Sequence, residues 1–293
     1  MKIVARGQVT AAAERAVVTE RERSEALHGG SNGTCDRCIP LNGCCAASAH
    51  YRGQVIIIAA FAAVVLLNVY AAVLIALRAL VYRVPMYRPM LLNIVLSFVP
   101  VVVAVLGVVG LLAIGAVGAG ADPPSGLGIL LWVFLVVGTL AWVLFFPNAI
   151  YLITELNFSH RRDDDPVPLW FDIVQTLTLT LSGIANAVLS MGVVESMFTI
   201  VVFDASEGIP LASWVFAGVV IVLGAIGVYL GRYLRFNSWD VRHPFGMLRK
   251  LRTHFAQRGK ALEAFGFVLT HAVLIALVYV PIYLLAYQAL RVG

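Results

Sequence analysis

Long apolar runs alternate with short polar segments along most of the chain. Six runs are long enough to cross a bilayer, because a helical span needs about 20 apolar residues, at about 1.5 Å each, for a core about 30 Å thick. Lipid offers no partners to free backbone groups, and the runs are too uniformly apolar for barrel strands. The pattern predicts an all-α fold, an integral membrane bundle of about six transmembrane helices over residues 54–293. The predicted spans are Val55–Leu77, Leu92–Leu112, Leu127–Phe146, Ile173–Val194, Trp214–Leu234 and Phe265–Tyr287.

The composition supports a membrane protein. Hydrophobic residues make up 60% of the 293-residue chain and charged residues 13%, whereas soluble globular chains are about 45–50% apolar and about 25% charged. The first 30 residues contain no apolar segment of the signal-peptide kind, so we expect insertion through the first span itself. We predict that residues 1–53 form a disordered polar tail.

All four cysteines lie in this tail, in the stretch CDRCIPLNGCC. A zinc ribbon needs a second pair about 15–20 residues from the first, and the spacing here is far shorter. We favour incidental thiols; one or two disulfides, or a small metal loop completed by His28 and His50, are the alternatives. We predict no metal and no cofactor, and read HRRDDDP (His160–Pro166) as a solvated loop. The cysteines are Cys35, Cys38, Cys44 and Cys45.

Positive charge is distributed unevenly between the loops. The loops after spans one, three and five share one face and carry thirteen Lys and Arg residues, against three near the membrane on the other face. The positive-inside rule places these three loops in the cytoplasm and both termini outside, in a plasma-membrane protein. The thirteen are Arg78, Arg83, Arg88, Arg161, Arg162, Arg232, Arg235, Arg242, Arg249, Lys250, Arg252, Arg258 and Lys260.

The net charge of +5 is not interpreted as nucleic-acid binding, because the basic residues sit at membrane ends, where they meet anionic lipid. The partners predicted are therefore membrane lipids and no nucleic acid. In the last loop, Met247, Leu248, Leu251 and Phe255 fall on one helical face. A basic helix lying on the membrane is one interpretation of this loop; an ordinary positively charged loop is the favoured one.

Three polar stretches should arrive at the same, cytoplasmic end of the bundle. They are FFPNAIYLITEL at the end of span three, LWFD at the start of span four and YLGRYLRFNSWD at the end of span five. In span four a polar stripe continues from Asp172 into the bilayer, so it should face other helices. Asp172 and Glu195 mark opposite ends of this span, about 35 Å apart. The candidate ligand-binding residues are Asn148, Tyr151, Glu155, Asp172, Arg232, Arg235, Asn237, Trp239 and Asp240.

The chemistry of these residues leaves several interpretations open. Arg232 and Arg235 offer forked donors suited to a carboxylate or phosphate. A network of arginine and carboxylate groups that ties the ends of spans three to five is the simplest interpretation. A pocket for an anionic headgroup is a more specific interpretation, and an active site is the most specific one. Arginine, tyrosine and tryptophan at helix ends are also typical membrane anchors.

These three stretches resemble, in order and spacing, the signatures of the prokaryotic membrane family known as domain of unknown function 1361. The resemblance covers about residues 55–290. The family often has Pro where this chain has Ile150 and Trp where it has Phe236; both exchanges are apolar and leave the polar cluster intact. The resemblance implies a multi-pass membrane protein and no particular activity. It points to Asn148, Tyr151, Asp172, Arg232, Asn237, Trp239 and Asp240.

Three functions follow as hypotheses. The first is binding or transport through an anionic site at the cytoplasmic ends of spans three to five. The second is a membrane enzyme acting on a lipid-linked substrate, with Asp172 or Asp240 as acid or base and a raised carboxyl pKa as its requirement. The third is a structural or assembly subunit in which the cluster only fixes helix ends.

Overall fold

The computed structural model describes residues 44–86, 88–119, 125–155, 166–203, 208–234 and 244–292. The chain divides into two units, residues 1–48 and 49–293, and the fold below is that of the second. In the described ranges all regular structure is helical, without a strand, so the predicted all-α class is confirmed. The predictions for the tail concern residues that lie largely outside these ranges, including the side chains of all four cysteines.

Within the described ranges, six helices are long and apolar enough to cross a membrane, as predicted. Two of them continue in a different helical form, α4 in the 3-10 turn η1 and α6 in the π-helical turn η3, and the short helix α8 precedes the last span. The elements are α2 (Cys44–Tyr82), α3 (Arg88–Gly118), α4 (Leu127–Tyr151), η1 (Leu152–Glu155), α5 (Leu169–Val201), α6 (Leu211–Tyr229), η3 (Leu230–Leu234), α8 (Pro244–Phe255) and α9 (Lys260–Val292).

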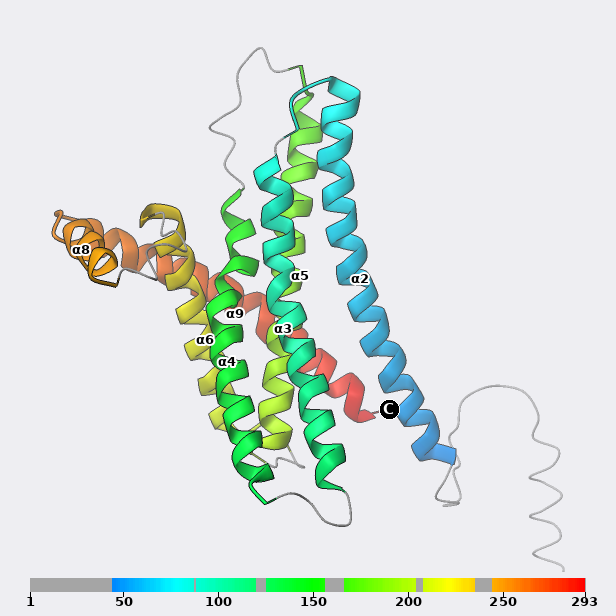
Figure 1. The fold of residues 1–293 in the computed structure, drawn as a ribbon. Helices are drawn as coiled ribbons and strands as arrows, with labels where there is room; N and C mark the ends of the chain where they lie inside the picture. The colour runs from blue at the N-terminus through cyan, green and yellow to red at the C-terminus, as the bar shows by residue number, and fades with distance from the viewer. Residues whose placement is uncertain are drawn as a thin grey trace, which may run out of the picture. The chain divides into compact units, whose positions relative to one another are not determined.

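Consecutive spans run in opposite directions, and α9 crosses the others obliquely (Figure 1). The bundle therefore has two ends. At the α4–α5 end, helices α2, α4 and α6 finish, and α3, α5 and α9 begin. At the α5–α6 end, α3 and α5 finish, and α4 and α6 begin. The three polar stretches singled out in the sequence belong to elements that meet the α4–α5 end.

Helix α5 is the central helix of the bundle. Of its most apolar 18-residue stretch, 56% of the residues are buried, whereas 17–39% are buried in the corresponding stretches of the other five spans. It packs against α3, α4, α6 and α9, and its side chains also reach α2. The other helices expose many Leu, Val and Ile side chains, as expected of surfaces that face lipid.

Small residues let α4 and η1 approach α5 and α6 closely. A Cβ atom at Gly183 of α5 would lie 2.6 Å from Leu152 Cβ and 2.7 Å from the carbonyl oxygen of Ala149. At Gly227 of α6 it would lie 2.4 Å from Pro147 Cγ. These contacts are too short for any side chain, so glycine is needed where the backbones meet.

We expect Gly183→Ala to destabilise the protein by about 1–3 kcal/mol, because the added methyl group overpacks the contact of α5 with α4. Gly138→Ala is the matched control, since a Cβ there meets nothing within 4 Å. In a helix interior that change should be neutral or slightly stabilising. The measurement is the thermal unfolding midpoint of both variants in detergent. Equal midpoints would show that this close approach does not matter.

Candidate functional site

The polar stripe of α5 is buried against other helices. Gln175, Thr176, Asn186 and Ser190 are each less than one-tenth exposed. Because lipid cannot satisfy polar groups, a stripe of this kind is stable only when protein atoms surround it. The expectation that this stripe faces other helices is confirmed.

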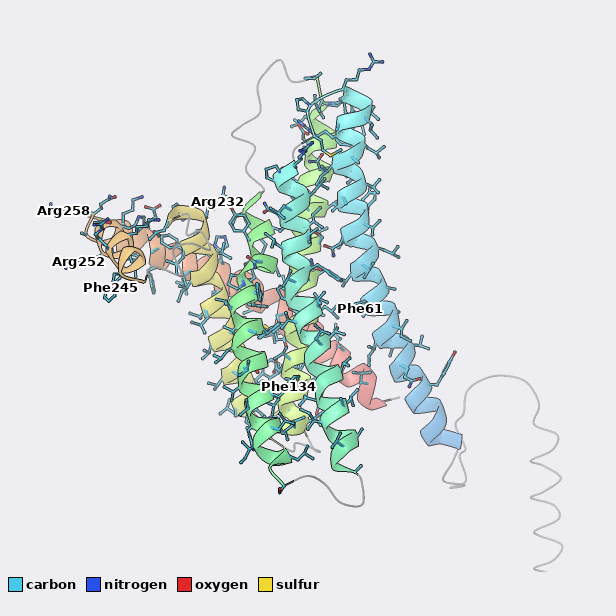
Figure 2. The ribbon with its side chains drawn as sticks, in the orientation of Figure 1. Phe61, Phe134, Arg232, Phe245, Arg252 and Arg258 are labelled. Carbon is cyan, nitrogen blue, oxygen red and sulfur yellow. The ribbon has the colours of Figure 1, made fainter. Side chains whose placement is uncertain are left out.

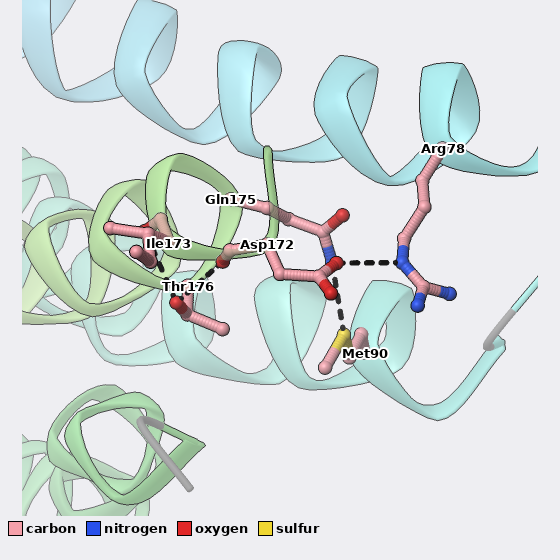
Figure 3. A network of polar contacts seen from close by, with 6 residues as sticks. All are labelled: Arg78, Met90, Asp172, Ile173, Gln175 and Thr176. Carbon is pink, nitrogen blue, oxygen red and sulfur yellow. Dashed lines mark hydrogen bonds and ion pairs between the residues drawn. The ribbon is translucent and has the colours of Figure 1, made fainter. Parts of the chain in front are cut away.

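At the α4–α5 end, Asp172 is paired with an arginine of α2 (Figure 3). Arg78 Nε donates to Asp172 Oδ1 at 3.0 Å, and both side chains are mostly buried. One turn further on, Gln175 Nε2 lies 3.6 Å from Met90 Sδ of α3. The Thr176 hydroxyl donates to the carbonyl oxygen of Asp172. The start of α5 is thus tied to α2 by charge and to α3 by a weaker contact.

In the middle of the bundle, a reciprocal amide pair joins α2 to α5. Asn68 Nδ2 donates to Asn186 Oδ1 at 2.8 Å, and Asn186 Nδ2 donates to Asn68 Oδ1 at 3.0 Å. Asn186 Nδ2 also donates to Ser97 Oγ of α3 at 2.9 Å. Three helices are thereby joined by hydrogen bonds that lipid cannot replace.

Arg232 lies in the π-helical turn η3, at the same end of the bundle as Arg252 and Arg258 (Figure 2). Its Nη1 donates to Thr154 Oγ1 of η1 at 3.0 Å. The side chain is half-buried. Single π-helical turns are often found at functional sites. One turn before Arg232, the hydroxyl of Tyr229 at the end of α6 lies 2.8 Å from His254 Nε2, which connects α6 to α8.

The structure gives Asp172 and Arg232 different partners. Gly183 packs on Leu152, which precedes Thr154 by two residues. Thr154, the partner of Arg232, is therefore close to the level of Gly183 in the bundle. Asp172 comes eleven residues before Gly183 in α5, so Asp172 lies about 16 Å along the helix from Gly183. A direct Asp172–Arg232 pair, as in the simple tying network, does not form. The polar residues at this end make two contact sites, α2–α5 and η1–η3.

The other candidate residues fall into two groups. Asn148 and Tyr151 are half-buried on α4, on the helical stripe that continues to Thr154. Glu155 closes η1, and its side chain is not among those described. The remaining four candidates lie outside the described residues, and their predicted roles stay predictions: Arg235, Asn237, Trp239 and Asp240.

The sequence interpretation missed several residues that complete these contacts, among them Arg78, Asn68, Ser97 and Thr154. Arg78 counted only as a loop charge, and Asn68 and Thr154 were not considered. One signal could have found Arg78. A carboxylate at membrane depth needs a partner, and Arg78 ends a predicted span at the same face as Asp172. Asn68 and Thr154 have no comparable signal, because single polar residues in spans are common.

Metal ligands do not gather in the part of the chain that the structure covers. No group of three or more His, Cys, Asp or Glu side chains is placed to hold an ion there. The stretch HRRDDDP falls outside this part except for Pro166.

A family model described as "Protein of unknown function (DUF1361)" matches residues 92–278. The chain belongs to this family. The matched range is narrower than the resemblance over residues 55–290, and it leaves out α2 with Asn68 and Arg78. Neither a curated protein nor a solved structure matches the chain significantly. Together with the six long apolar helices, the match supports an integral membrane protein of unknown activity.

We expect Arg78 and Asp172 to stabilise the bundle as a pair. In a double-mutant cycle with Arg78→Met and Asp172→Asn, the coupling energy should be on the order of 0.5–3 kcal/mol, because the pair is shielded from water. The exposed Lys260–Glu263 pair of α9 is the control, and its coupling should be clearly smaller because water screens it. Reversible unfolding in detergent measures both cycles. Additive losses for Arg78 and Asp172 would contradict the assignment.

Proposed function

We propose that this integral membrane protein binds an anionic lipid headgroup or a phosphate-bearing solute at the α4–α5 end, with Arg232 as the central cation. One observation carries the proposal. The Arg232 guanidinium has five N–H donors, yet among the described residues its partner is the neutral Thr154 hydroxyl and no carboxylate pairs with it. A half-buried arginine whose remaining N–H groups can still donate is suited to binding a phosphate or a carboxylate.

The alternatives fit these contacts less well. If Arg232 only tied helix ends together, it would be expected to pair with a carboxylate of a neighbouring helix. Asp172, the described candidate, is instead neutralised by Arg78. The same ion pair weighs against Asp172 as the acid or base of an enzyme, because a group in that role needs to exchange its proton at neutral pH.

The helix α8 favours a lipid headgroup over a free solute. It exposes Phe245 and Leu248 beside the exposed basic residues Arg249, Lys250 and Arg252. An amphipathic basic helix next to transmembrane ends is suited to an anionic membrane surface. In the orientation favoured by the positive-inside rule, this surface is the cytoplasmic leaflet of the plasma membrane.

Native mass spectrometry of the full-length protein tests the proposal. Phosphatidylglycerol and, separately, inorganic phosphate are added to the wild type and to Arg232→Ala. Losing hydrogen bonds to a charged group costs about 1.5–3 kcal/mol, so the variant should bind phosphatidylglycerol about 10- to 100-fold more weakly. Binding of inorganic phosphate with the same dependence would identify a solute site.

The matched control is Arg88→Ala, which removes an exposed arginine from the same end of the bundle. It should bind phosphatidylglycerol like the wild type. All three proteins are checked for unchanged thermal unfolding before comparison. Equal binding by the wild type, Arg232→Ala and Arg88→Ala would overturn the proposal.

A further inference from the structure

A carboxyl group is buried in the half of the bundle away from Arg232. Glu195 of α5 is 0% exposed and lies six residues before Val201, the end of the helix, which is about 9 Å along the axis. Ionisable residues at membrane depth are costly and usually mark functional sites. The anion site proposed above makes no use of Glu195.

Hydroxyl groups from two other helices surround the Glu195 carboxyl. Ser213 Oγ of α6 donates to Glu195 Oε1 at 2.8 Å, and the Tyr279 hydroxyl of α9 donates to Oε2. Thr199 Oγ1, one turn further along α5, lies 3.2 Å from Ser213 Oγ. Because Ser213 gives its single proton to Glu195, Thr199 is the donor to Ser213. The hydroxyls thus form a chain that leads from Glu195 towards the end of α5.

This shell contains no counter-ion among the described residues. The ionisable groups that interact with Glu195 are Tyr279 and Tyr283, both on α9. Among the described residues of α3, α4 and α6, the group that interacts with the Glu195 carboxyl is the Ser213 hydroxyl. A permanently charged carboxylate at this depth would call for a cation. Hydroxyl groups can bond to either protonation state of Glu195, because each hydroxyl can rotate to donate to a carboxylate or to accept from a carboxyl.

We propose that Glu195 is a proton-binding site inside the membrane, which exchanges its proton with water at the α5–α6 end through Ser213 and Thr199. In the uptake step, Ser213 passes its proton to Glu195 Oε1 and takes one from Thr199. Thr199 takes a proton from a hydronium ion at the α5–α6 end, which is left as a water molecule, and the Glu195 carboxylate becomes a neutral carboxyl. Release reverses each step. Tyr279 donates to Oε2 throughout and holds the carboxyl in place.

The arrangement of Thr199 and Ser213 supports this route. Thr199 is two residues from the end of α5, and Ser213 is two residues from the start of α6. Both side chains are nearly fully buried. The hydroxyl pair therefore lies between the Glu195 carboxyl and the ends of α5 and α6.

Infrared difference spectroscopy of the full-length protein, titrated across pH, tests the proposal. The expected result is a carbonyl stretch of a neutral carboxyl that grows as the pH falls and is lost in Glu195→Gln. Glu263→Gln, which removes an exposed carboxyl from α9, should leave the band in place. A Glu195 band that is present or absent at every pH would overturn the proposal, because the carboxyl would then serve only to clamp helices.

Two further measurements keep the test independent of one variant. Thr199→Val should slow the appearance of the band after a pH jump several-fold and leave its final size unchanged; an unchanged rate overturns the route.

If Glu195→Gln does not fold, the wild type is treated with a hydrophobic carbodiimide, which reacts with neutral buried carboxyls. Peptide mass spectrometry should then find Glu195 modified at low pH and unmodified at high pH. Modification independent of pH overturns the proposal.

Discussion

The polar side chains of α5 can be buried in a membrane only where other helices cover them, because lipid provides no hydrogen-bond partners. This constraint arranges the bundle. The amide of Asn186 is satisfied by Asn68 and Ser97, and the ends of the same helix are held by Arg78 at one side and by Ser213 and Tyr279 at the other. Helices α2, α3, α6 and α9 therefore lie where α5 has polar side chains to match.

The two ends of the bundle offer different chemistry. At the α4–α5 end, the Asp172 carboxylate is paired with Arg78, and Arg232 has no acidic partner among the described residues. At the α5–α6 end, the Glu195 carboxyl is surrounded by hydroxyls and lacks a described cation. An anion site at η3 and a proton site on α5, in opposite halves of the bundle, would fit a transport function better than a purely structural one, since both chemistries involve exchange with water.

Much of the architecture could be predicted from the sequence. The six apolar runs identify the spans because a bilayer admits only helices of sufficient length. The spacing of polar residues after Asp172 identifies the buried face of α5 because helical period fixes which residues share a face. Topology alone brings the polar stretches of α4, α5 and α6 to one end.

The partners could not be predicted in the same way. The helical period predicts which face of a helix is buried. It does not predict how far neighbouring helices are shifted along their axes. Asp172 and Arg232 share an end of the bundle, yet they lie at different depths, and Asp172 meets Arg78 from a helix outside the three motifs. Glu195 looked like a marker for the far end of its span, because its partners Ser213 and Tyr279 come from two other helices. Such contacts depend on tertiary packing.

If the polar face of α5 holds the bundle together, Asn186→Ala should destabilise the protein more than the loss of a lipid-facing side chain does. The control is Leu181→Ala, because Leu181 is on the same helix and 45% exposed. Unfolding of both variants is measured in the same detergent. We expect a loss of about 1–3 kcal/mol for Asn186→Ala, from three broken hydrogen bonds, and a clearly smaller loss for Leu181→Ala. An equal or larger loss for Leu181→Ala would show that the polar face does not hold the bundle together.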